Sequence, residues 1–539
     1  MSDTETTTIY PSAQAEAQAR QMHQRCEASF RSLVPNLERV VGLPEGRPLR
    51  AVRSPFTGID AFGVPQATLA DLDQAIVRAR NAGRRWGKAP AATRARFLYK
   101  LHDLLWQHMD EILDVIQWET GKSRYHAYDE IQDIALNCRY YARTLSHAVR
   151  DERRRGAFPG VTRTFVMYEP KGVVGVIAPW NYPLSMGITD AIAALAAGNA
   201  IVTKPDSNTP LSVVVGKALM VEAGLDPDLF IMVPGRGSEL GTPLIKQVDY
   251  MMFTGSTATG RIIAKQSGEN LIGVSAELGG KNPMIVLEDA RVDDAVAGLV
   301  RSAYANTGQL CVSIERLYVQ DSIYDEFKAK LIKRINDMKV EVSFDWEADM
   351  GVLVSDHQLE TIDTQVQDAL SKGAVALAGG HALPEISYTA YAPTLLEGVE
   401  EGMTLYDHET FGPVVSLYRF HTDEQAIALA NDTNYGLNAS VWGKPAHAVA
   451  VARRIEAGTV NVNEGFTAAW GSTDAPMGGW KDSGLGRRHG IEGIHKYMES
   501  RTIAVQNRAV PIAPVMGLSQ EQYVKVLKFA LKAMRRLHL

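Results

Sequence analysis

Hydrophobic residues recur along the chain with two different spacings, and the change between them divides the sequence into regions. From about residue 68 to residue 147, apolar positions follow one another at intervals of three and four, which predicts helices. Beyond an alternating stretch at 163–168, which suits an edge strand, short apolar runs are separated by segments of helical length. Strands this apolar, alternating with helices, are typical of parallel sheets covered on both faces. The pattern therefore predicts a helical start followed by two α/β series.

Helices are expected at 69–86, 91–106, 108–120 and 124–147, with a lone helix at 12–35 and a turn at 54–58. Strands of the first series are expected at 173–177, 200–203, 229–233, 250–253 and 273–276. Those of the second series are expected at 283–287, 316–319, 374–378, 414–418, 440–442 and 459–463, and a last β-like stretch runs from 500 to 506.

The end of the chain, residues 519–539, has a basic amphipathic pattern. Its cationic and apolar residues alternate with helical spacing: Lys525, Lys528, Lys532, Arg535 and Arg536 among Val524, Leu527, Leu531, Met534 and Leu537. Such a helix can lie on an anionic membrane. It can equally pack its apolar stripe on the protein itself or on a neighbouring subunit, and the sequence leaves both alternatives open.

Composition limits the class of protein. With 539 residues, 45% hydrophobic and 22% charged, the chain is long enough for two or three globular units. A net charge of −6 gives no reason to expect nucleic acid as a partner. The three cysteines, Cys26, Cys138 and Cys311, form neither a disulfide framework nor a metal-site pattern, so no metal is expected. Without a signal peptide or an 18-residue apolar run, the sequence predicts a cytoplasmic protein, with peripheral membrane contact through the tail as an alternative.

Two runs carry candidate catalytic groups beside glycines. Residues 277–283 read Glu-Leu-Gly-Gly-Lys-Asn-Pro, and residues 306–311 read Asn-Thr-Gly-Gln-Leu-Cys. Glycine lets the backbone approach a ligand closely, and a cysteine is nucleophilic as a thiolate. Glu277 and Cys311 are therefore candidates for a base and a nucleophile.

Four further runs adjoin predicted strands: Ala-Pro-Trp-Asn-Tyr-Pro at 178–183, Lys-Pro-Asp-Ser at 204–207, Phe-Thr-Gly-Ser-Thr-Ala-Thr-Gly at 253–260 and Glu-Thr-Phe-Gly-Pro at 409–413. The turn at 253–260 follows a strand and opens a helix, where backbone amides can meet a pyrophosphate. Turns at the carboxyl edge of a parallel sheet are where such folds bind ligands.

These six runs, in this order, resemble the aldehyde dehydrogenase superfamily over about residues 50–505. The sequences at 171–177, 204–207 and 475–479 are most similar to those of the NADP-type succinate-semialdehyde dehydrogenases of the second actinobacterial kind. The resemblance implies an α/β fold with two parallel-sheet domains, a Rossmann-type cofactor domain and a catalytic domain, plus a small β oligomerisation element. The ranges it implies are an N-terminal helical extension at 1–50, a cofactor domain at 51–155 and 171–284, a catalytic domain at 285–495, oligomerisation strands at 156–170 and 496–510, and a tail at 511–539.

The resemblance also implies roles for three catalytic residues. Cys311 would attack the aldehyde carbon to form a thiohemiacetal, which becomes a thioester once hydride has left. The Asn181 side-chain amide and the Cys311 backbone N–H would form the oxyanion hole. Glu277 would activate the water that hydrolyses the thioester, and its presence favours release of a free carboxylic acid over transfer to coenzyme A.

The cofactor implied by the resemblance is NADP, with NAD as an alternative. Residues expected to contact it are Trp180, Lys204, Ser207, Gly255, Ser256, Gly260, Glu409 and Phe411. Relatives that favour NAD carry a glutamate three residues after the lysine, where this chain has Ser207. A carboxylate there would repel a 2′-phosphate, whereas serine leaves room for it.

The substrate is less well defined than the chemistry. Succinate semialdehyde is the first expectation, yet the helix after residue 183 lacks the arginine that many semialdehyde-specific relatives carry, and Arg316 is the alternative cation. Candidate pocket residues are Trp118, Tyr182, Met186, Phe466 and Trp470, which would equally suit a medium-chain, long-chain or aromatic aldehyde. The assembly implied is a homodimer or homotetramer. A non-catalytic scaffold protein with the same fold is the alternative of another class.

Overall fold

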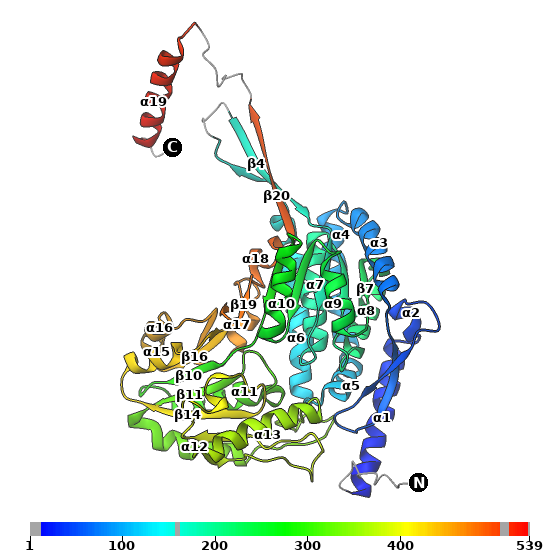
Figure 1. Cartoon of the computed structure of the whole chain (residues 1–539), viewed down its shortest axis with the longest axis vertical. Helices are drawn as coiled ribbons and strands as arrows, with labels where there is room; N and C mark the ends of the chain where they lie inside the picture. Colours follow the sequence, from blue (N-terminus) through cyan, green and yellow to red (C-terminus); the bar gives the residue numbers. More distant parts are fainter. Residues whose placement is uncertain (1–11, 157–161, 507–516, 537–539) are drawn as a thin grey trace. The chain divides into compact units, whose positions relative to one another are not determined.

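The computed structural model describes residues 12–156, 162–506 and 517–536, and the chain divides into two compact units. The larger unit comprises 1–148 and 170–498, and the smaller one comprises 149–169 and 499–539. Both sheets with helices on their faces belong to the larger unit (Figure 1).

The larger unit begins with helices, as the apolar spacing predicts. They are α1 (Ala13–Leu33), α2 (Leu37–Val41), α3 (Leu69–Trp86), α4 (Ala91–Gln107), α5 (Met109–Thr120) and α6 (Arg124–Ala148). Local signals set their ends. The side chains of Thr68 and Asp71 form a reciprocal capping box at the start of α3, and Gly121 ends α5 with a left-handed φ of 76°. The predicted helices 69–86, 91–106, 108–120 and 124–147 are confirmed to within one residue.

A six-stranded sheet forms the first α/β layer, in the order β19-β9-β8-β5-β6-β7. Its strands are β5 (Val173–Ile177), β6 (Ala200–Lys204), β7 (Phe230–Met232), β8 (Tyr250–Thr254), β9 (Gly273–Glu277) and β19 (Gly484–Leu485). Its helices are α7 (Pro183–Ala197), α8 (Leu211–Glu222), α9 (Gly237–Ile245) and α10 (Thr257–Glu269). The five strands from β5 to β9 are parallel, as predicted, whereas β19 adds an antiparallel edge that the sequence pattern did not reveal.

A seven-stranded sheet forms the second layer, in the order β12-β13-β14-β11-β10-β16-β17. Its strands are β10 (Asn282–Val286), β11 (Ile314–Gln320), β12 (Val375–Ala378), β13 (Thr394–Glu397), β14 (Val414–Phe420), β16 (Asn438–Trp442) and β17 (Thr459–Val462). All pairs are parallel except β12 with β13. The predicted strand at 374–378 exists and forms an antiparallel edge of this mostly parallel sheet, because the unpredicted β13 pairs with it in the opposite direction.

The remaining elements of the larger unit are short strand pairs and helices. The strand pairs are β1 (Leu49–Arg53) with β2 (Asp60–Pro65), and β15 (Tyr435–Gly436) with β18 (Trp480–Lys481). The helices are α11 (Val292–Tyr304), α12 (Tyr324–Asn336), α13 (Asp356–Ser371), α14 (Thr404–Asp407), α15 (Asp423–Asn431), α16 (Pro445–Ala452), α17 (Thr467–Gly471) and α18 (Gly490–His495), with short turns at Ala305–Gly308 and elsewhere.

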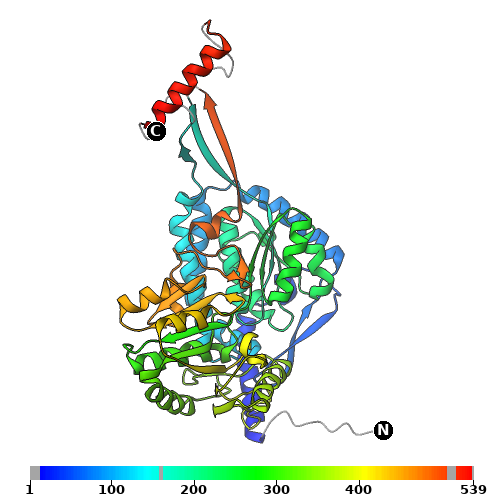
Figure 2. The ribbon, with the colours of Figure 1, turned by 60° about the vertical axis from the view of Figure 1, so that its left-hand side comes forward.

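The smaller unit contains a three-stranded sheet in the order β20-β4-β3 and a final helix. Its elements are β3 (Glu152–Arg154), β4 (Thr162–Pro170), β20 (Met498–Gln506) and α19 (Gln520–Arg536). Figure 2 shows β4 and β20 side by side. The strands expected at 163–168 and 500–506 are thus present, and their role in oligomerisation stays a prediction.

Candidate active site

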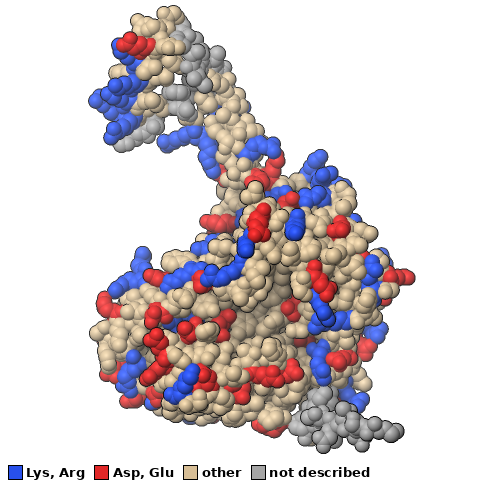
Figure 3. Space-filling view, in the orientation of Figure 1, with Lys and Arg blue, Asp and Glu red and all other residues tan. Residues whose placement is uncertain are grey.

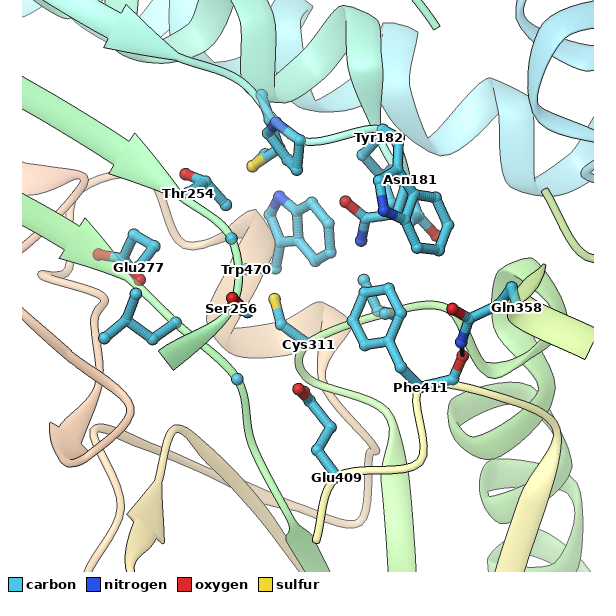
Figure 4. Close-up of a pocket in the computed structure, with 17 residues that line it drawn as sticks. Asn181, Tyr182, Thr254, Ser256, Glu277, Cys311, Gln358, Glu409, Phe411 and Trp470 are labelled. Carbon is cyan, nitrogen blue, oxygen red and sulfur yellow. Dashed lines mark hydrogen bonds between the residues drawn. The ribbon is translucent and has the colours of Figure 1, made fainter. Parts of the chain in front are cut away.

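A cavity of about 270 Å³ lies beyond the carboxyl ends of β5, β8 and β9, where they meet the segment that precedes β11. The strand order reverses here, because β5 pairs with β6 on one side and with β8 on the other. Ligands of open α/β sheets bind at such reversals. The lining residues are Pro179, Trp180, Asn181, Tyr182, Met186, Thr254, Gly255, Ser256, Glu277, Leu278, Gly279, Leu310, Cys311, Gln358, Glu409, Phe411 and Trp470 (Figure 4). Five of the six sequence motifs therefore converge on one cavity.

The segment that carries Cys311 is held in an unusual backbone conformation. Asn306 and Thr307 have left-handed φ angles of 50° and 57°. A β-branched residue avoids this region, so the strain persists only where the surroundings fix it. Gly308 follows with a φ of 70°, and a Cβ there would lie 2.0 Å from the carbonyl oxygen of Gly412. Close backbone packing therefore determines where the thiol emerges.

Hydrogen bonds tie the turn after β5 to this segment. The Asn181 side-chain amide donates to the Gln309 carbonyl at 3.0 Å, and the Asn306 amide donates to the Asn181 carbonyl at 3.0 Å. The same carbonyl accepts a bond of 2.7 Å from Lys122 Nζ, which forms a buried ion pair of 2.6 Å with Glu130. A primary amide has two N–H groups, so Asn181 keeps a second donor for a ligand.

Glu277 ends β9 as a buried carboxylate whose Oε1 has no hydrogen-bond partner among the described residues. Burial raises the pKa of Glu277 to about 7, although Arg488 and Lys496 oppose the rise. A carboxyl group with this pKa can take up and release protons near neutral pH.

Burial raises the pKa of the Cys311 thiol to about 12, and the negative charge of Glu409 adds to the effect. Attack on a carbonyl group therefore requires a base to remove the proton. Figure 4 shows the thiol in the middle of the cavity, with Asn181, Trp470 and Glu409 around it and Glu277 at the end of its strand.

Two helix N-termini and a buried lysine lie at the carboxyl edge of the six-stranded sheet. Helix α9 begins at Gly237, where a Cβ would lie 3.6 Å from Lys204 Cε, and α10 is capped by the exposed Ser256. Helix N-termini and lysine side chains bind phosphate. Burial lowers the pKa of Lys204, and its Nζ donates to the carbonyl of Pro205 at 2.9 Å. These residues fit the pyrophosphate and adenosine ribose of a dinucleotide.

Three of the predicted cofactor residues, Lys204, Ser207 and Gly260, do not line the cavity. Ser207 lies half-buried beyond the end of β6, and the neighbouring Asp206 accepts a 2.8 Å hydrogen bond from the backbone of Asn208. Gly260 is buried in the first turns of α10, where a Cβ would lie 2.3 Å from Leu278. The glycine therefore lets the helix pack against the turn after β9, a role in packing rather than in contact with the cavity.

Glu409, Phe411 and Trp180 also line the cavity. The Glu409 carboxylate accepts a 2.8 Å hydrogen bond from the backbone N–H of Gly280, and a Cβ on Gly279 would lie 2.3 Å from it. Burial, with Glu315, raises the pKa of Glu409 to about 8. The rings of Trp180 and Phe411 meet edge to face with centroids 5.4 Å apart.

Three of the five predicted substrate residues, Tyr182, Met186 and Trp470, line the cavity. The Tyr182 and Trp470 rings lie 5.7 Å apart, and the Trp470 indole donates to Asp133 at 2.7 Å. Phe466 packs on Trp470 at 5.8 Å and, together with it, borders a smaller adjoining cavity.

Trp118 and Arg316 lie elsewhere. Trp118 is fully buried in α5, with its ring 5.1 Å from Phe62 of β2 and 5.9 Å from His23 of α1, and it does not line the cavity. Arg316 is buried in β11 and donates to main-chain carbonyls, including that of Lys281 at 2.8 Å. The sequence-based suggestion that Arg316 supplies charge to the substrate is wrong, because its guanidinium is used to hold backbone together.

A buried ion pair beside the cavity was not predicted. Arg488 contacts Asp190 of α7 at 2.7 Å and donates to Thr254 at 2.7 Å and to the sulfur of Met186 at 2.9 Å. Asp190 is the one charged residue of an otherwise uncharged, fully buried helix, and a buried carboxylate requires a partner. That signal could have predicted a cation, although not which one. In the described part of the chain, no three His, Cys, Asp or Glu side chains are grouped to hold a metal ion.

Comparison with known proteins gives one consistent result. Residues 44–503 match the Aldehyde dehydrogenase family. A Mycolicibacterium smegmatis protein provisionally named succinate-semialdehyde dehydrogenase (NADP+) is 48% identical over 494 residues, which cover 92% of this chain and 95% of that protein. A Mycobacterium tuberculosis protein with the same provisional name, number 2, is 45% identical over 482 residues, covering 89% and 93%. A solved structure described as an NADP-dependent enzyme of E. coli has 34% identity and a TM-score of 0.81, covering 86% of this chain and 95% of that one.

The predicted resemblance and fold class are thereby confirmed. The matched residues span both sheets and every motif that reaches the cavity. The chain therefore belongs to the aldehyde dehydrogenase family, whose members are oxidoreductases that oxidise aldehydes.

Proposed function

We propose that the chain oxidises an aldehyde to a free carboxylic acid through a thioester on Cys311. The observation that supports this proposal is the convergence of three groups on one cavity: a thiol, an amide donor in Asn181 and an unpaired buried carboxylate in Glu277. Each has a chemical role that the reaction requires.

In the first half of the reaction, the sulfur of Cys311 attacks the aldehyde carbon after its proton has passed to a base. The carbonyl oxygen becomes an oxyanion, which the free N–H of Asn181 and the backbone N–H of Cys311 stabilise. A bound nicotinamide dinucleotide supplies the hydride acceptor for the thiohemiacetal carbon. Trp180, Ser256 and Glu409 in the cavity, with Lys204 at the end of β6, would hold it.

In the second half, Glu277 removes a proton from water as the oxygen attacks the thioester carbon. The carbon–sulfur bond breaks, the acid leaves, and the sulfur of Cys311 takes back the proton that the base removed in the first half. Because its pKa lies near 7, Glu277 can pass the proton on to solvent after each turnover.

For the cofactor, we propose NADP with NAD as an alternative. Ser207 places no carboxylate beyond the end of β6, and Asp206 is engaged with the backbone of Asn208. The two mycobacterial relatives carry NADP+ in their names, which supports the same preference.

For the substrate, the names of these relatives favour succinate semialdehyde, which we propose as the first candidate. A second candidate is a medium-chain, long-chain or aromatic aldehyde. In the described residues, neither the cavity nor the adjoining one is lined by a lysine or arginine to pair with a carboxylate. The adjoining cavity is instead bordered by Asp129 and Asp133.

We keep the predicted domain ranges, although the division at residue 284 falls within β10, and a homodimer or homotetramer, as parts of this proposal. A non-catalytic scaffold is the competing function. It is disfavoured because a scaffold has no need of a strained thiol segment beside an unpaired carboxylate.

The decisive experiment measures formation of reduced cofactor with NADP and with succinate semialdehyde, hexanal, decanal or benzaldehyde. Cys311→Ala should abolish turnover and leave cofactor binding intact, because the thiol forms the covalent intermediate. The matched control is Cys138→Ala, a buried cysteine in α6 far along the chain, which should keep its activity. Turnover by Cys311→Ala, or none by the wild type with any aldehyde, would refute the mechanism.

A further inference from the structure

The C-terminal helix α19 presents two opposed faces. Its basic residues Lys525, Lys528, Lys532 and Arg535 recur at intervals of three and four, so they share one side of the helix. Figure 3 shows these cations gathered along one edge of the helix. The opposite side carries aliphatic and aromatic residues, Tyr523, Val526, Leu527, Ala530, Ala533 and Met534, with Leu531 at its border.

The apolar side of α19 is only partly covered. None of the helix's 17 residues is buried; on the apolar side Val526 and Leu531 are each 55% exposed, whereas Tyr523, Leu527, Ala530 and Met534 are half-buried. A run of large apolar side chains this exposed marks a binding surface.

The charge of α19 selects among the partners that could cover it. The helix carries five cations and one carboxylate, Glu521, which pairs with Lys525 at 2.6 Å. The helix is therefore positively charged, whereas the whole chain has a net charge of −6. Pairing with a second copy of α19 would bury the apolar stripes but bring two cationic faces together. An anionic lipid surface instead accepts the apolar side at the acyl boundary and attracts the cations at the headgroups.

We propose that α19 binds the surface of an anionic membrane and lies in its plane. At about 1.5 Å per residue the helix is about 25 Å long, and it is highly charged. No described helix of the chain combines the length and apolar content that crossing a membrane requires. The association is thus peripheral and depends on both faces at once.

The test is co-sedimentation of the full chain with vesicles of neutral phosphatidylcholine, alone or mixed with anionic phosphatidylglycerol. Binding to the anionic vesicles should be at least tenfold stronger and should weaken in high salt, because salt screens the headgroup attraction. Equal binding to both vesicles, or to neither, would overturn the proposal.

Variants separate the contribution of each face. Reversing Lys525, Lys528 and Lys532 to glutamate, or changing Leu527 and Leu531 to aspartate, should each abolish vesicle binding. The matched control reverses three exposed lysines of the larger unit, Lys100, Lys246 and Lys265, and should bind as the wild type does.

Two further measurements complete the test. Oxidation of a water-soluble aldehyde should be unchanged in every α19 variant, since no residue of α19 lines the cavity. If the α19 variants instead change the sedimentation velocity of the lipid-free protein while the wild type ignores anionic vesicles, the helix contacts another subunit and the membrane proposal is wrong.

Discussion

Two carboxylates share the cavity, and their surroundings differ. Glu409 is held: its carboxylate accepts a hydrogen bond from Gly280 and lies against the bare Cα of Gly279. Glu277 is poised: one of its oxygens has no partner among the described residues. Burial raises the pKa of both, to about 8 and about 7. A fixed carboxylate suits binding and an unpaired one suits proton transfer, so hydrogen bonding, more than pKa, distinguishes their roles.

Among the variants that test the roles of these two carboxylates, Glu277→Gln should change the steady-state rate most. The amide cannot accept the water proton, so the steady-state rate should fall about 10²- to 10⁴-fold. A first burst of reduced cofactor should remain, because thioester formation precedes hydrolysis. Rapid-mixing absorbance measurements resolve the burst from the steady state.

Glu409→Gln is the matched control for that measurement. It should raise the KM for the cofactor and show no stalled thioester, since Gly280 can still donate to the amide oxygen. An unchanged steady-state rate in Glu277→Gln, or a burst followed by a stall in Glu409→Gln, would reverse the assignment of the two carboxylates.

The pH dependence provides the next largest effect. A base with a raised pKa near 7 is protonated and inactive below that pH, so kcat should fall about tenfold per pH unit on the acid side and level off above it. The profile should be kept in Glu409→Gln and lost in Glu277→Gln. A kcat independent of pH between 5 and 8 in the wild type would count against Glu277 as the base.

The smallest effect is expected for cofactor preference, when Ser207→Glu adds a carboxylate outside the cavity. Ser207→Glu should shift preference from NADP towards NAD by about five- to tenfold, since repulsion between half-exposed charges is worth only about 1 kcal/mol. The ratio of kcat/KM for the two cofactors measures it, with Ser207→Gln as the uncharged control. An identical ratio in both variants would show that Ser207 does not face the 2′ position.

Which residues line the cavity could be predicted better for residues at the ends of strands than for residues within helices. Asn181, Glu277 and Ser256 follow strands of one parallel sheet, whose carboxyl ends must meet at one edge, so their convergence could be predicted. Trp118 could not be placed in this way, because helical spacing indicates burial without identifying the neighbour. The two aromatic rings that contact it, those of Phe62 and His23, belong to β2 and α1.

Short edge strands, and ion pairs between residues far apart in the chain, could also not be predicted from the sequence. Strand β19 has two residues, too few for a period to show, and β13 has four. The partner of Asp190 is set by the fold, which brings Arg488 back to α7 from near the end of the larger unit. Neither feature leaves a local signal that pattern analysis can use.

The backbone of Gly308 packs directly against the backbone of Gly412, so the two turns that carry them cannot move independently. One glycine belongs to the segment that seats the thiol, and the other follows Phe411 in the turn that borders the dinucleotide side. With backbone against backbone and no side chain to yield, displacement of either turn has to move the other. A shift of the turn that carries Phe411 would therefore reach the segment of Cys311 through main-chain contact, with no side chain between them.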